Sequence, residues 1–365
     1  MVVMGERSLR RRVLLGAGVA AAVAAVAGGT GLAVLKYQID HYRDPGRQRI
    51  AAAGYRQRVA RVGEVAFSYA EGPDNGPPLV LLHAQHMDWY SYHLVLPALA
   101  ESFHVFDVDY PGHGGTVCPA GYPMTAERIG ADLAGFLESV VGQPAHVSGN
   151  SSGGLLAIWL AANRPRLVRS VVLEDPPLFS AEYPRIARTI ADRSFRTCAN
   201  AVREGTGDFL LYWIRASKPF FDKNVGPGAA RLLIEAIKEF RRARPGEPVE
   251  IGLLPNDTVR QFLRGLDQFD PRFGAAFHDG SWHAGFDHAS ALGRVGCPAL
   301  LIQANFSVLA DGTLDGAMTG DDAARALALL RRGTYRRIDA THVVHLDKPQ
   351  DFVRMVTGFV VTGNQ

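Results

Sequence analysis

The sequence has few cysteines, with only Cys118, Cys198 and Cys297 among its 365 residues. No two of them are spaced as C-x-x-C, so neither a zinc knuckle nor a dithiol motif built on such a pair is indicated. We interpret them as three unpaired, largely buried thiols. If the chain is exported, one disulfide plus a free thiol is the alternative, and the sequence does not decide between the two.

A large excess of charge of either sign is also lacking, since the formal net charge is +3. Part of that excess comes from the arginines within residues 7–12, and the remainder of the chain is near neutral. The composition therefore does not indicate nucleic acid or another polyanion as a partner. The histidines outside residues 341–346 show no metal-ligand spacing, and we expect neither a metal nor an organic cofactor.

A long apolar run occurs at the N-terminus, where residues 13–35 contain no charged side chain. The preceding residues 7–12 read Arg-Ser-Leu-Arg-Arg-Arg, and residues 8–15 resemble a twin-arginine export signal. The run is also long enough to span a bilayer, which takes roughly 20 apolar residues. We therefore expect a signal peptide or membrane anchor over residues 1–36, a polar linker over residues 37–61, and an extracellular or cell-envelope location.

From residue 62 onward, short strand patterns alternate with helical patterns. Strands are expected over residues 65–69, 79–83, 103–109, 145–148, 167–173, 300–302 and 335–338, and helices over residues 126–141 and 154–163. This alternation predicts an α/β fold with a mostly parallel sheet covered on both faces. Between about residues 178 and 295 the strand pattern gives way to helical segments broken by Pro and Gly, which indicates a helical insertion.

A candidate nucleophile turn lies at residues 149–153, which read Gly-Asn-Ser-Ser-Gly and fit the pattern G-x-S-x-G. The turn directly follows the strand expected at residues 145–148 and directly precedes the helix expected at residues 154–163. A nucleophile elbow requires this setting, because small residues allow a tight turn that lifts one hydroxyl above the sheet edge. We predict that Ser151 is the nucleophile. A serine-glycine helix cap without chemistry is the alternative.

With this turn the chain resembles the α/β-hydrolase family. Residues 81–85, Leu-Leu-His-Ala-Gln, are similar to the family's strand-end H-G-x motif, whose third residue donates a backbone N–H to the oxyanion hole. The resemblance implies Gln85 as one donor and Ser152, which follows the nucleophile, as the second. The chain departs from the motif at Ala84, where the family has Gly.

The resemblance covers about residues 62–177 and 290–361. Residues 109–116 are similar to the family's D-x-P-G-x-G-x-S/T turn, which we interpret as structural because its glycines permit positive φ. The implied organisation is an α/β-hydrolase core over residues 62–177 and 290–365. The insertion over residues 178–289 occupies the place of the helical cap that roofs the active site in this family.

The candidate base lies in residues 341–346, Thr-His-Val-Val-His-Leu, between an expected strand and the helix that opens at Pro349. The segment resembles the family's G-x-G-H-x-x-H segment, with His342 in the catalytic position. A histidine can accept the serine proton and return it to a leaving group near neutral pH. His345, three residues further on, is the competing candidate for the base. We interpret it as a structural residue.

A third group must orient His342, and two carboxylates compete for this role. Many family members place an Asp after the strand that follows the cap, but Ser307 stands at that point, and the longer loop beyond it holds Asp315. A subset of the family places the acid at the end of the strand after the elbow helix, where this chain has Asp175. We favour Asp175, because a strand end holds a carboxylate more rigidly than a glycine-containing loop.

These residues predict a serine hydrolase that cleaves an ester, thioester or lactone through an acyl intermediate on Ser151. Two alternatives stay open: a C–C bond hydrolase or perhydrolase-type enzyme with the same triad, and a non-catalytic binding protein of the same fold. We expect a largely apolar small-molecule substrate, because the proposed cap is rich in large apolar side chains. These are Phe209, Leu210, Leu211, Tyr212, Trp213, Ile214, Phe220 and Phe221.

Overall fold

A computed structural model of the protein describes residues 36–37, 39–224, 226–252, 254 and 256–363. The signal or anchor expected over residues 1–36 lies outside this part except for its last residue. Within the described part, no helix combines the length and apolar character needed to cross a membrane. The described residues divide into a larger compact unit, within Gly46–Gly205 and Phe269–Gln365, and a smaller one, within Met1–Pro45 and Thr206–Gln268.

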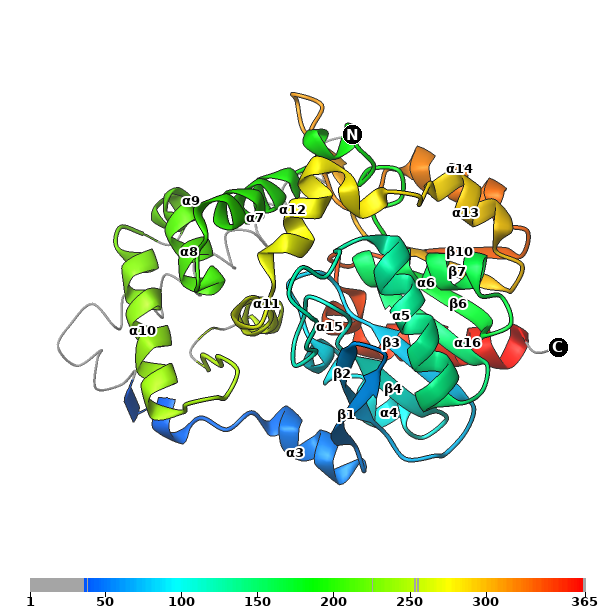
Figure 1. Ribbon diagram of the computed structural model, residues 1–365, viewed down its shortest axis with the longest axis horizontal. Coiled ribbons are helices and arrows are strands. Elements are labelled where there is room, and N and C mark those ends of the chain that lie inside the picture. Colours follow the sequence, from blue (N-terminus) through cyan, green and yellow to red (C-terminus); the bar gives the residue numbers. More distant parts are fainter. Residues whose placement is uncertain (1–35, 38, 225, 253, 255, 364–365) are drawn as a thin grey trace. The chain divides into compact units, whose positions relative to one another are not determined.

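An eight-stranded sheet forms the centre of the larger unit, in the order β1-β2-β4-β3-β5-β6-β7-β10 (Figure 1). The strands are β1 (Arg56–Val62), β2 (Val65–Glu71), β3 (Pro78–Leu82), β4 (His104–Val108), β5 (Ala145–Asn150), β6 (Val168–Glu174), β7 (Ala299–Gln303) and β10 (Gly333–Arg337). The β1–β2 and β2–β4 pairs are antiparallel. The other five pairs are parallel, which confirms the expected mostly parallel sheet.

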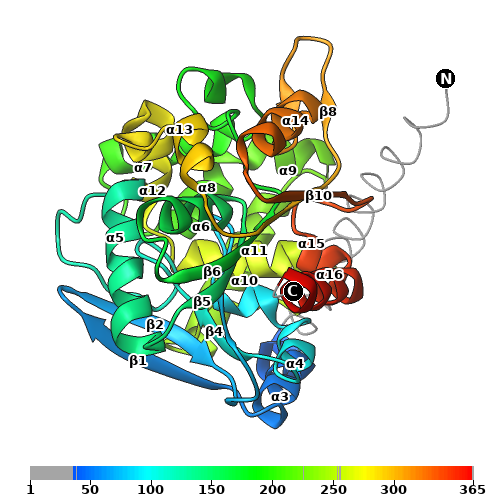
Figure 2. The ribbon, with the colours of Figure 1, turned by 90° about the vertical axis from the view of Figure 1, so that its right-hand side faces the viewer.

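Both faces of the sheet are covered, which explains why its central strands read as continuous apolar runs. Every residue of β3, β5 and β7 is buried. One face packs on α4 (Leu96–Leu99) and α16 (Pro349–Gly363), whose apolar side chains share a cluster with β3 and β7. The other face packs on α5 (Ala126–Phe136) and α6 (Ser152–Asn163), and Figure 2 shows α5 and α16 on opposite sides of the sheet.

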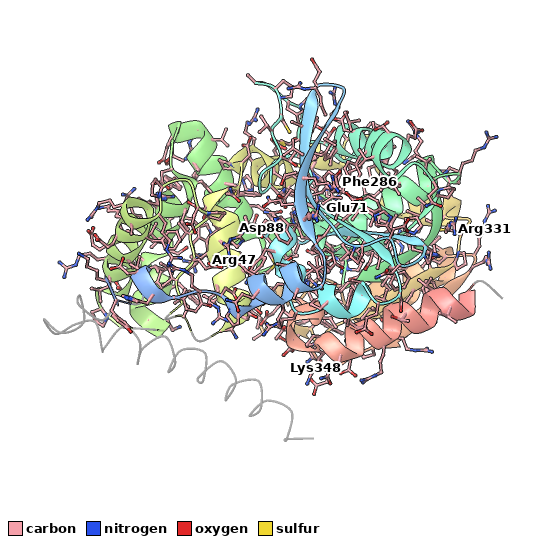
Figure 3. All side chains as sticks on the ribbon, turned by 90° about the horizontal axis from the view of Figure 1, so that it is seen from below. Arg47, Glu71, Asp88, Phe286, Arg331 and Lys348 are labelled. Atoms are coloured by element: carbon pink, nitrogen blue, oxygen red, sulfur yellow. The ribbon has the colours of Figure 1, made fainter. Side chains whose placement is uncertain are left out.

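The region expected to be a polar linker instead contains a helix and an edge strand. The helix α3 (Pro45–Ala52) and the strand β1 fall almost entirely within residues 37–61. β1 has the composition of a linker because it lies at the edge of the sheet with most side chains exposed. β1 is held by its antiparallel pairing with β2 along its whole length, and Arg58 also pairs with Glu71 at 2.6 Å. α3 is held by Ile50, which is buried in the core cluster, and Arg47 of α3 lies 5.6 Å from the ring centre of Tyr90. Figure 3 labels Glu71 and Arg47.

The insertion over residues 178–289 is helical as expected, but it is divided between the two units. In the larger unit, α7 (Asp192–Glu204) packs on α12 (Pro271–Asp279), with Phe195 stacked 5.1 Å from Phe277. The smaller unit contains α8 (Phe209–Ala216), α9 (Lys218–Asn224), α10 (Ala229–Ala243) and α11 (Asp257–Asp267). There, Arg241 of α10 pairs with Asp208 at 2.6 Å and with Asp267 at 2.5 Å.

The three cysteines are unpaired, as the sequence analysis expected. Cys198 is fully buried between α7 and α12, where a Cβ added to Gly274 would lie 2.5 Å from its sulfur. Cys118 and Cys297 are partly exposed. Burial raises the pKa of the Cys118 and Cys297 thiols to about 11, so both are protonated near neutral pH.

The packing of α5 on α6 predicts that Gly130→Ala destabilises the fold. A Cβ at this position would lie 2.2 Å from the ring of Trp159, which is 1% exposed and donates a hydrogen bond to Glu127 at 3.0 Å. The ring therefore has no room to move, and overpacking of this kind costs about 1–3 kcal/mol. Urea unfolding of the full chain measures the loss.

Gly358→Ala is the matched control, because Gly358 lies inside α16 with open space around its added Cβ. Removing a glycine from a helix interior stabilises by roughly 0.5–1 kcal/mol, so this variant should be at least as stable as the wild type. A Gly130→Ala protein as stable as the wild type would contradict the described contact between α5 and α6.

Candidate active site

Ser151 lies in a strained turn between β5 and α6. Its backbone has φ 56° and ψ −120°, which a non-glycine residue rarely adopts. The Ser151 amide donates to the Glu174 carbonyl at 2.9 Å, which ties the turn to the neighbouring strand β6. Added Cβ atoms at Gly149 and Gly153 would each lie 2.2 Å from a carbonyl oxygen, so the turn requires glycine at both positions. Strain held in this way is typical of functional sites.

The two predicted oxyanion donors lie in segments that are joined by one tyrosine. The Ser152 amide is in the first turn of α6, where backbone N–H groups have no carbonyl partner within the helix. Tyr110 donates its hydroxyl proton to the carbonyl of His83 at 3.1 Å, two residues before Gln85. The Ser152 hydroxyl lies 2.9 Å from the same tyrosine oxygen and can donate to it.

His342 and Asp175 form a close pair. Asp175 directly follows β6, has φ 44° and is 2% exposed. One of its carboxylate oxygens lies 2.7 Å from Nδ1 of His342, and the other accepts a hydrogen bond from the Ala304 amide at 3.0 Å. Desolvation lowers the pKa of His342, but the hydrogen bond and charge of Asp175, with the charge of Glu174, outweigh it and raise the pKa above 6.5.

The rival acid, Asp315, lies elsewhere in the fold. It belongs to a short hairpin in which β9 (Leu314–Asp315) pairs with β8 (Ser307–Val308), and Ser307 is its register partner. The neighbouring Leu314 bridges to Thr189, in the segment before α7. The carboxylate that lies against His342 Nδ1 is therefore that of Asp175, which directly follows the central strand β6 and is not part of this hairpin.

Two residues that the sequence analysis did not single out connect these groups. Asn150, the residue before Ser151, donates from Nδ2 to the Glu174 carbonyl at 3.1 Å and to the His342 carbonyl at 3.0 Å. Glu174 lies 2.9 Å from Nδ1 of His345, and both side chains are fully buried. The only sequence signals for these roles were the variable position inside G-x-S-x-G and the second histidine of H-x-x-H.

The turn over residues 109–116 wraps around one buried carboxylate. Asp109 accepts hydrogen bonds from the amides of Trp89 at 2.8 Å and Gly115 at 2.9 Å. A Cβ at Gly114, where φ is 53°, would lie 2.2 Å from this carboxylate. Desolvation and the nearby charge of Asp88 raise the pKa of Asp109 to about 7. These contacts give the turn a structural role, as the sequence analysis expected.

Across the described ranges of the chain, no group of three or more His, Cys, Asp or Glu side chains is arranged to hold a metal ion. The ionisable groups of the candidate site instead lie in pairs, each a carboxylate with one histidine.

Residues 77–349 match the alpha/beta hydrolase fold family. The magnesium-chelatase 30 kDa subunit of Rhodobacter capsulatus is 32% identical over 80% of this chain and 90% of its own length. A pimeloyl-[acyl-carrier protein] methyl ester esterase of Aeromonas hydrophila is 34% identical over 31% of this chain and 44% of its own length. The carboxylesterase CesB of Bacillus subtilis has a similar structure, with a TM-score of 0.58, 16% identity, and coverage of 89% of this chain and 96% of its own. The chain therefore belongs to the alpha/beta hydrolase fold family, and it is a hydrolase.

Proposed function

We propose that the protein hydrolyses an ester, thioester or lactone of a largely apolar small molecule through an acyl intermediate on Ser151. The observation that carries the proposal is the 2.7 Å hydrogen bond between His342 Nδ1 and Asp175, together with the positive φ of Ser151 in its turn. Asn150 supports this arrangement, because it precedes Ser151 and its side chain bonds the His342 backbone at 3.0 Å. An activated serine of this kind attacks acyl carbons.

The proposed reaction begins with proton transfer from Ser151. Because Nδ1–H of His342 donates to Asp175, Nε2 carries the lone pair that can accept the serine proton. The serine oxygen attacks the acyl carbon, and the amides of Gln85 and Ser152 stabilise the resulting oxyanion. The imidazolium then returns its proton to the leaving alcohol or thiol as the acyl–oxygen or acyl–sulfur bond breaks.

Deacylation repeats these steps with water in place of Ser151. His342 accepts a proton from the attacking water, and the second tetrahedral intermediate uses the same two oxyanion donors. Its collapse breaks the bond to Ser151, and His342 returns the proton to the serine oxygen. The acid product leaves and the starting state of the enzyme is restored, so the chain's own residues account for every proton.

The apolar character of the substrate is inferred from the helices of the smaller unit. Four of the expected large apolar residues, Phe209, Leu210, Leu211 and Ile214, are buried and stabilise that unit. Tyr212, Trp213 and Phe221 are partly exposed, and Phe220 is 49% exposed. Trp213 packs against Phe221 and Phe262 within this unit. The apolar substrate is proposed from composition alone, because small-molecule sites are lined mainly by apolar and aromatic side chains with few polar groups.

A binding role besides hydrolysis is the second candidate, because one relative that matches over most of both chains is named as a subunit of a magnesium chelatase. Such a role would use the same fold as a binding scaffold. It differs from the first proposal in one measurable respect, since a binding scaffold does not need a reactive Ser151.

Ser151→Ala is expected to abolish ester hydrolysis, with a fall in kcat on the order of 10⁴ or more. The measurement is a panel of p-nitrophenyl esters and lactones, with β-diketones included to detect C–C bond hydrolysis. A fluorophosphonate probe should label the wild type at Ser151 and leave the variant unlabelled. Full esterase activity in the variant would reject the acyl-serine mechanism, and a folded wild type that resists the probe would favour the binding role.

Asp175→Asn is expected to lower kcat on the order of 10⁴, because Asn supports the wrong tautomer of His342 and does not stabilise its imidazolium. The matched control is Asp315→Asn, which removes the rival carboxylate and should leave kcat near the wild-type value. Circular dichroism of both variants establishes that the fold is retained. If Asp315→Asn were inactive and Asp175→Asn active, the acid would have to be reassigned.

We also propose that the protein is exported, on the basis of the arginines and the apolar run within residues 7–35. Cell fractionation with N-terminal sequencing of the recovered protein measures both its location and any cleavage. Replacing Arg10 and Arg11 together by Lys should retain the protein in the cytosol, since a twin-arginine signal depends on that pair. A wild type found full-length in the cytosolic fraction would contradict this proposal.

A further inference from the structure

A second carboxylate–histidine pair lies next to the proposed catalytic pair. Glu174 and Asp175 are consecutive residues at the end of β6, and each lies against a different histidine of the segment that carries His342. Asp175 lies 2.7 Å from Nδ1 of His342. Both carboxylate oxygens of Glu174 lie 2.9 Å from Nδ1 of His345. Glu174 is the last residue of β6, and Asp175 leaves the strand with φ 44°, so the two adjacent carboxylates meet different histidines.

The second pair is fully buried and closely bonded. The side chains of Glu174 and His345 are both 0% exposed. The backbone amide of His345 also donates to Glu174, at 3.0 Å, and its ring is stacked 3.9 Å from that of Tyr92. Replacing a buried polar pair by apolar residues of similar volume is often neutral or stabilising. Stability alone therefore gives a weak explanation for a Glu and a His at these positions.

The geometry connects this pair to His342 in two ways. Asn150 bonds both the Glu174 carbonyl and the His342 carbonyl, so the end of β6 and the histidine segment share one anchor. The charges that act on His342 come from Asp175 and, more weakly, from Glu174, and both raise the pKa of His342 against the effect of desolvation. A substitution of Glu174 would thus alter both the position of His342 and the charge that acts on it.

We propose that Glu174 and His345 are positioning residues for His342: the pair fixes the 342–345 segment against the end of β6, and the Glu174 charge assists Asp175 in stabilising the imidazolium. The inference rests on the proposed function, since it assigns a role relative to His342 as the base. It adds a second carboxylate to that function. Asp175 bonds His342 directly, whereas Glu174 acts through the position of the 342–345 segment and through its charge.

The test is the pH profile of kcat/KM for p-nitrophenyl ester hydrolysis by Glu174→Gln. His342 must be neutral to accept the serine proton, so activity falls as the pH drops through its pKa, which lies above 6.5 in the wild type. Glu174→Gln keeps the shape of the side chain and removes the charge. We call the low-pH side of the kcat/KM profile, on which activity falls, the acid limb. We expect it to move to lower pH by about 0.5–1 unit in Glu174→Gln, because loss of a neighbouring charge changes the pKa of His342 by this order.

Glu182→Gln is the matched control. Glu182 also accepts a hydrogen bond from a histidine amide, that of His288 at 2.9 Å, but the charges that act on His342 do not include it. Its acid limb should coincide with that of the wild type. An unchanged limb in Glu174→Gln, or an equal displacement in both variants, would overturn the proposal, since a purely structural pair alters stability without moving the limb.

Glu174→Asp provides a second measurement if the Gln variant does not fold. It keeps the charge but shortens the side chain, so the acid limb should stay near the wild-type pH while kcat falls by about tenfold as His342 loses its alignment. An unchanged kcat would overturn the positioning role. Fluorophosphonate labelling of wild-type Ser151 separates this inference from the proposed function. If the wild type is labelled and the acid limb of Glu174→Gln does not move, only this inference is rejected. If the wild type is not labelled, both proposals are rejected.

Discussion

The 2.9 Å hydrogen bond from the Ser151 amide to the Glu174 carbonyl joins the ends of two parallel strands, and the candidate site is built around that junction. It holds Ser151 at positive φ where β5 ends and α6 begins. Asp175 follows Glu174 directly after the end of β6, so the same junction brings the nucleophile turn and the carboxylate to one edge of the sheet. In open α/β sheets, ligands bind at this edge, beyond the carboxyl ends of the strands.

The polar groups around the junction are ordered by contacts that leave them little freedom. Tyr110 joins the segment after β3 to the first turn of α6, and Asn150 joins β6 to the segment that carries His342. Asp175 uses one oxygen on the Ala304 amide and the other on His342. Such networks position the reacting groups before the substrate binds, which is the main physical source of catalytic power in sites that stabilise an oxyanion.

Much of the fold could be predicted because its signals are local. The alternation of apolar strands and helical spacing predicted the mostly parallel sheet, and the glycines around Ser151 predicted the tight turn that the structure contains. The errors occurred where composition and burial diverge. β1 is an edge strand with exposed polar side chains, so its sequence could not be distinguished from a linker. Likewise, nothing in the helical pattern indicated that α7 and α12 group with the sheet while α8 to α11 form a separate unit.

For the site, the sequence by itself determined the strand-turn-helix around Ser151 and the H-x-x-H segment, because both depend on residues that are neighbours in the chain. It favoured Asp175 but could not determine which carboxylate meets His342, since Asp175 follows one predicted strand and Asp315 lies in the loop after another. Only the tertiary structure decided this: the parallel register that pairs Glu174 with Ile302 leaves Asp175 beside Ala304, whereas Asp315 pairs with Ser307 in a separate hairpin. Contacts between residues more than a hundred positions apart depend on which strands pair and in what register, and the continuous apolar runs of buried parallel strands lack the alternation that would specify it.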